Sequence, residues 1–76
     1  MDERAAREYL LENDSQFQQL VDEHQRFERQ LAEFTGRPFL TVEEQFRETI
    51  IKKKKLALKD QLQMLIQRVR TQGSVN

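Results

Sequence analysis

Residues 51–62 read Ile51-Lys52-Lys53-Lys54-Lys55-Leu56-Ala57-Leu58-Lys59-Asp60-Gln61-Leu62. Four consecutive lysines stand in a segment that has neither proline nor glycine. Apolar residues recur there at helical spacing. One series steps by alternating intervals of four and three residues: Ile51, Lys55, Leu58, Leu62, Leu65 and Val69. This spacing is a heptad seam interrupted by one lysine, and it predicts a helix with one packed face.

The predicted helix extends in both directions from this segment. Thr41 and Glu44 have the spacing of a capping box, in which each side chain bonds the backbone N–H of the other residue. No helix breaker follows until Gly73, so we expect a helix over residues 42–70 and a frayed tail over 73–76. Apolar residues beside the seam give this helix a second flank, typical of a helix that contacts more than one neighbour: Phe46, Ile50 and Leu56.

A second long helix is predicted over residues 15–35. Two interleaved series repeat there every seven residues: Phe17, His24 and Leu31, and Leu20, Phe27 and Phe34. The connector begins at Gly36, which can adopt a positive φ, and contains Pro38, which prevents the helix from continuing. So short a connector favours an antiparallel hairpin.

A short helix is predicted over residues 2–12, capped by Asp2. The polar residues 13–15 either separate it from the next helix or only kink it, and the sequence leaves both open. A helix this short is marginal in water and needs a surface to pack on. It, or another subunit, would cover the apolar surplus at the end of the long C-terminal helix: Leu65, Ile66 and Val69.

These elements predict a single all-α domain over residues 1–76, an antiparallel helical hairpin of two long helices with a short N-terminal helix. A chain of 76 residues builds only a small core, and it has no cysteine for a disulfide or a thiolate metal site. Self-association is the common remaining source of stability. We therefore expect a homodimer that forms a four-helix bundle.

Charge is divided unevenly along the chain. Residues 1–35 carry nine acidic and four basic side chains, whereas residues 36–76 carry four acidic and nine basic ones. If the turn is centred near Pro38, facing residues have numbers that sum to about 77, and Asp22 and Glu23 lie opposite the lysine run. The lysines are then a pairing device within the hairpin, and the alternative is a basic segment that binds an external anion such as nucleic acid.

Several classes of protein are not expected. No apolar run is long enough to span a membrane, and the acidic N-terminus lacks the apolar region of a signal peptide, so we expect a cytoplasmic protein. Neither a phosphate-binding loop nor a nucleophile elbow is present, and a helical hairpin offers little concavity for its carboxylates to act in. We expect no enzymatic activity, no cofactor and no metal.

The candidate functional residues are few. His24, the one histidine, lies on the apolar stripe and is either a packed residue or a pH-sensitive switch, and no second histidine or cysteine completes a metal site. Phe39 and Leu40 either fold over the hairpin end or contact a partner. Together with the outward lysines they form the candidate partner-binding set: Lys52, Lys53, Lys54, Phe39 and Leu40. This set predicts a non-catalytic protein–protein interaction module or regulatory adaptor, with a nucleic-acid-associated protein as the alternative.

The segment 51–62 resembles the signature of the YdcH-like family, small bacterial proteins of unknown function. Phe17, Leu20 and the pair Glu23-His24 are similar to the first-helix pattern of that family. The resemblance spans roughly residues 8–70, and Lys54 departs from it because glutamate or glutamine is more usual there. It implies a self-associating helical hairpin in the bacterial cytoplasm, with no catalytic residues.

Overall fold

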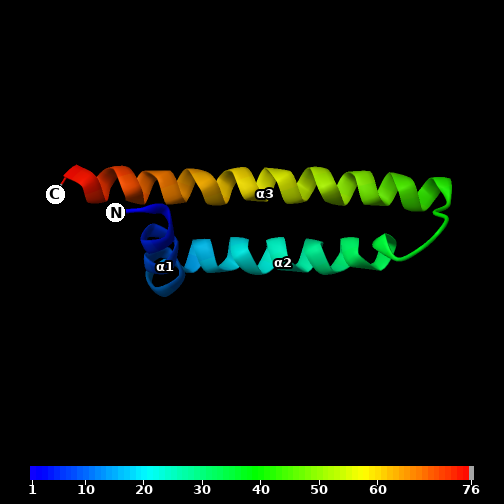
Figure 1. The fold of residues 1–76 in the computed structure, drawn as a ribbon, viewed down its shortest axis with the longest axis horizontal. Helices are drawn as coiled ribbons and strands as arrows, with labels where there is room; N and C mark the ends of the chain where they lie inside the picture. Colours follow the sequence, from blue (N-terminus) through cyan, green and yellow to red (C-terminus); the bar gives the residue numbers. More distant parts are fainter. Residues whose placement is uncertain (76) are drawn as a thin grey trace.

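The chain folds into three helices in the computed structural model, which describes residues 1–75 and the side chains of residues 1–72. The helices are α1 (Glu3–Asn13), α2 (Ser15–Thr35) and α3 (Val42–Val75). Helices α2 and α3 run antiparallel, and α1 lies across them at the end where the termini meet (Figure 1). We call this the open end of the hairpin and the connector side the closed end. The fold is all-helical, as predicted, in an elongated shape of 53 × 18 × 17 Å.

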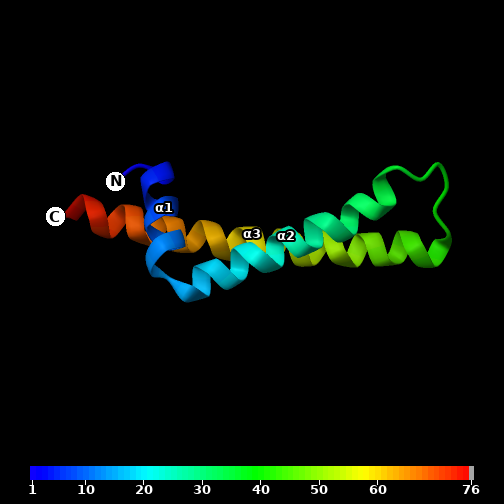
Figure 2. The same cartoon turned by 90° about the horizontal axis from the view of Figure 1, so that it is seen from below.

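A single residue separates α1 from α2. Asp14 has φ −124° and ψ 108°, and its carboxylate accepts a hydrogen bond from the N–H of Phe17 at 3.0 Å. Asp2 caps α1 in the same way, with its carboxylate 2.7 Å from the N–H of Ala5. The interruption at residues 13–15 is therefore a true break, and Figure 2 shows α1 turning away from the line of α2 at this point.

Two predicted helix ends differ from the structure. Gly36 follows α2 with φ −88° and ψ 2°, so it does not use the positive φ that was expected. Helix α3 continues to Val75, past the predicted end at Arg70 and through Gly73. Glycine costs a helix only about 1 kcal/mol relative to alanine and keeps its N–H, so it does not stop a helix as proline does. Fraying of the tail stays a prediction, and Asn76 lies outside the described residues.

The predicted hairpin register is wrong by about two helical turns. Lys55 pairs with Glu28, with Nζ and Oε1 2.6 Å apart. Phe27 borders one groove with Ala57 and Leu58. Numbers of facing residues thus sum to about 83, because the connector is extended and carries the first turns of α3 beyond the end of α2 (Figure 1). The symmetric turn assumed from the sequence does not form.

The core lies at the open end, where all three helices meet. Its buried members are Ala6, Leu10, Phe17, Leu62 and Ile66. Partly buried residues pack around them: Leu20, Val21, Leu65 and Val69. Helix α1 of the same chain therefore covers the apolar surplus of α3, as one of the two expected arrangements required. Between Phe17 and Leu58 no residue is fully buried, so the closed half of the hairpin has no core of its own.

We expect Phe17→Ala to destabilise the fold by about 3–5 kcal/mol, because Phe17 is fully buried and truncation leaves a cavity between three helices. That cost is comparable to the whole stability of a small domain. Urea unfolding followed by far-ultraviolet circular dichroism measures it. The matched control is Phe39→Ala, which removes the same atoms from a side chain that is 87% exposed. Equal losses in the two variants would contradict this placement of the core.

Candidate interaction surfaces

The lysine run divides between paired and unpaired side chains. Lys55 is half-buried beside α2 and pairs with Glu28, while Lys52 lies 3.6 Å from Glu48 one turn earlier on its own helix. Lys53 and Lys54 are exposed and form no ion pair with any residue whose side chain the structure describes. Two lysines of the run are therefore available to a partner.

The acidic residues expected to face the run do not pair with it. Within the described side chains, Asp22 and Glu23 take part in no ion pair, and Glu28 takes the place predicted for them. The Lys55 ammonium, by hydrogen bond and by charge, holds the pKa of Glu28 below its ordinary value, with a smaller contribution from the charge of His24. His24 itself is half-buried on α2, on the side facing Glu28.

The closed end exposes large apolar side chains. Phe39, Val42 and Phe46 are 87%, 83% and 68% exposed. Leu40 is half-buried, so of the two predicted connector contacts Leu40 folds back and Phe39 points to solvent. Phe39 is therefore the better candidate for a partner contact than Leu40.

Polar contacts around Glu44 fix the start of α3. The predicted capping box forms, with Thr41 and Glu44 bonding each other's N–H at 3.0 and 3.1 Å. Arg37 also pairs with Glu44 across the connector. The N–H of Thr41 is the main reason why the pKa of Glu44 lies below its ordinary value. These contacts hold the connector in place while its apolar side chains remain exposed.

A second series of residues runs along α3 outside its buried stripe, which Leu58, Leu62 and Ile66 form. Its members step by 4, 3, 4, 3 and 4 residues and are all exposed: Phe46, Ile50, Lys53, Ala57, Asp60 and Met64. We call this series the outer seam. The sequence indicated its first part through Phe46 and Ile50. Its continuation to Met64 was missed because Lys53 and Asp60 interrupt the apolar pattern.

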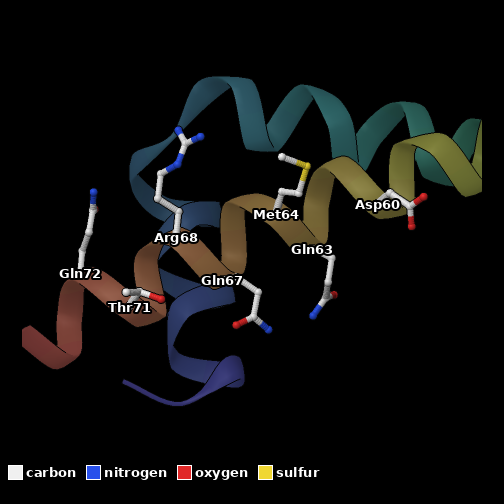
Figure 3. Close-up of a pocket in the computed structure, with 7 residues that line it drawn as sticks. All are labelled: Asp60, Gln63, Met64, Gln67, Arg68, Thr71 and Gln72. Atoms are coloured by element: carbon white, nitrogen blue, oxygen red, sulfur yellow. The ribbon is translucent and has the colours of Figure 1, made fainter.

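An open hollow lies on this side of α3. It measures about 810 Å³ and is lined by residues of α3 alone: Asp60, Gln63, Met64, Gln67, Arg68, Thr71 and Gln72. Figure 3 shows Met64 and Arg68 on one side of the helix and Gln63 and Gln67 on the other. This hollow lies on one helix and is open to solvent, so it is a surface feature and not an enclosed site.

Two features are absent from the described residues. No group of three or more histidine, cysteine, aspartate or glutamate side chains among them is placed to hold a metal ion. No helix in this part of the chain is long and apolar enough to cross a membrane.

Comparison with known proteins identifies a family. A family model described as a protein of unknown function, DUF465, matches residues 17–66. The chain belongs to this family. It is the YdcH-like family of small proteins that the segment 51–62 and the first-helix pattern indicated. No curated protein and no solved structure matched the chain. The matched range covers most of α2, the connector and α3 from its start to Ile66, so the family pattern is that of the hairpin itself.

We expect Glu28→Gln to lower the melting temperature (Tm) of the protein near neutral pH and to lose this effect in acid. The folded-state pKa of Glu28 is depressed below 4.5, so its contribution to stability is present above pH 4.5 and is lost as pH falls through the folded-state value. Thermal unfolding of variant and wild type between pH 7 and pH ~2.5 measures the difference. Glu33→Gln, at an exposed position of the same helix, is the control. A Tm difference that stays constant down to the lowest pH would contradict the prediction.

Proposed function

We propose that the protein is a non-catalytic interaction module that pairs with a second copy of itself and presents its closed end to another protein. The observation that supports this function best is the outer seam, an exposed apolar series at heptad spacing on α3. A helix in a monomer normally keeps the face opposite its core polar. Phe46 and Met64, exposed by 68% and 65%, depart from that rule.

The charges of the outer seam are complementary in an antiparallel pairing. If Phe46 faces Met64 of the second copy, the numbers of facing residues sum to 110, so Lys53 faces Ala57 and Ile50 faces Asp60. Asp60 of the second copy then lies three residues further along, about 4.5 Å, within reach of the Lys53 ammonium. Two-fold symmetry produces the same pair twice. Small Ala57 permits close approach, and the two ion pairs select this register over others.

This pairing is the dimeric four-helix arrangement expected from the sequence, with the two α3 helices at its centre. It places the two closed ends at opposite ends of an elongated dimer. Each would carry Phe39 and Val42 with Lys54 beyond them on α3. Lys52 contributes less because it pairs with Glu48, and Leu40 contributes little because it is half-buried. We propose that this surface binds an acidic protein segment with apolar side chains, so that the dimer is a bivalent adaptor.

We expect the self-association to depend on the signs of the charges at residues 53 and 60. Lys53→Glu or Asp60→Lys alone places like charges together and weakens the dimer on the order of tenfold, because close like charges repel and each 1.4 kcal/mol is a factor of ten. The double variant Lys53→Glu/Asp60→Lys restores the pairs and regains most of the affinity. Sedimentation equilibrium at micromolar concentration measures the dissociation constant.

The matched control for this experiment is Lys54→Glu, which makes the same charge change outside the outer seam. It should leave the dissociation constant nearly unchanged. A purely monomeric wild type would overturn the proposed dimer. A dimer that responds equally to Lys53→Glu and Lys54→Glu, or is not rescued by the double variant, would place the interface elsewhere.

We expect binding of the protein partner to require the closed end and not the outer seam. A partner captured from native cell extract, then purified, should bind the wild type and lose binding to Phe39→Asp and to Lys54→Glu. Tyr9→Asp is the matched control, because Tyr9 is a half-exposed aromatic residue on α1. If no captured protein distinguishes these variants, the adaptor function is wrong.

A salt titration separates the adaptor from the nucleic-acid alternative. Binding of RNA or DNA that falls steeply with salt and is lost in Lys53→Glu/Lys54→Glu would favour that alternative, since phosphate contacts release counterions. The pairing of Lys52 with Glu48 and of Lys55 with Glu28 leaves only half of the run for phosphates. This is why the adaptor is preferred.

A further inference from the structure

A cavity of about 190 Å³ lies between the three helices at the open end. Cationic side chains reach it from separate elements: Arg7 from α1, and Lys55 and Lys59 from α3. His24 and Glu28 border it from α2. Its apolar wall is formed by Leu62 and Ile66, which are 6% and 2% exposed and belong to the core. The cavity is thus formed within one chain and does not involve the outer seam.

The charges that border this cavity do not balance. Glu28 and Lys55 neutralise each other at 2.6 Å. Arg7 and Lys59 form no ion pair with any described side chain. Three cationic groups against one carboxylate leave the cavity with a net charge of +2 when His24 is neutral. Like charges that share a space repel one another, and Arg7 and Lys59 are both exposed, so a dianion can reach them from solvent.

We propose that this cavity binds a small phosphate-type dianion, either inorganic phosphate or a phosphomonoester. A dianion matches the net charge of the cavity. The donors also fit phosphate chemistry, because a guanidinium can donate two parallel hydrogen bonds to phosphate oxygens and an ammonium binds them as a point charge. The imidazole of His24, on α2, supplies an N–H donor. The two cations without partners, Arg7 and Lys59, are the principal ligands, and His24 is a supporting one.

Binding at this place has a structural consequence. Arg7 and Lys59 belong to different helices, so a bound dianion would join α1 to α3 directly above the core. A ligand that binds the folded chain and not the unfolded chain raises stability by mass action. We therefore expect the anion to fix the docking of α1, the element that closes the open end.

Thermal unfolding in sodium phosphate, compared with sodium chloride at equal ionic strength, tests the proposal. Phosphate should raise the Tm of the wild type with saturation, whereas chloride should not. Arg7→Gln and Lys59→Gln should each weaken the apparent affinity by about tenfold or more, since each removes a charged hydrogen-bond donor. Arg4→Gln, on the same helix as Arg7 but outside the cavity, is the matched control and should bind like the wild type.

Further measurements identify the source of the dianion and the place where it binds. Phenyl phosphate in place of inorganic phosphate distinguishes the two sources of the dianion, because tighter binding of the ester indicates a phosphomonoester. Amide chemical shifts in a ¹⁵N-labelled sample should change around Arg7, His24 and Lys59 on addition of either probe. The variant Lys53→Glu, which is expected to weaken the dimer, should still bind phosphate, which separates this proposal from the proposed dimer. Shifts spread evenly over all basic residues, or equal Tm changes in phosphate and chloride, would overturn the proposal.

Discussion

The structure depends on the burial of Phe17 between three helices. Phe17 lies in the first turn of α2, and it is fully buried only because α1 folds back over it. The fold-back requires the break at Asp14, whose carboxylate caps the new helix and replaces the lost backbone bond. Without that break, α1 would continue along the line of α2, and Leu62 and Ile66 of the longer α3 would lose the helix that covers them. The core therefore depends on the break between α1 and α2, and the break depends on the Asp14 cap.

Concentrating the core at one end leaves the other end dependent on different interactions. In the closed half, half-buried aromatic residues and the pair of Lys55 with Glu28 hold α2 to α3. Such exposed pairs contribute little stability, so they set alignment more than strength. The closed half therefore gains most from additional packing by another chain. This uneven distribution of stability gives the exposed Phe39, Val42 and Phe46 a physical reason to be contact residues.

The helices could be predicted from the sequence because their signals are local. The capping box at Thr41 and the heptads of α2 need only neighbouring residues. The register could not be predicted, because it depends on the path of the connector, and an extended path moves α3 by about two turns. The continuation through Gly73 was missed because a glycine only weakens a helix. Only the first part of the outer seam was recognised from the sequence. An exposed apolar residue on α3 indicates a contact surface only once the structure shows which face of that helix is buried.

The corrected register also changes the meaning of the divided charge. With Asp22 and Glu23 facing the lysines, the two halves of the chain would have neutralised each other and left little for a partner. In the actual register Glu28 alone, among the described side chains of the first half, pairs with the lysine run, and its partner is Lys55. Among the remaining cations two groups stand apart: Lys53 and Lys54 on the outside of α3, and Arg7 and Lys59 around the cavity at the open end. The first lies beside exposed apolar residues and suits a protein surface, whereas the second is enclosed by three helices and suits a small anion. A zero net charge therefore conceals two distinct groups of cations, and only the fold separates them.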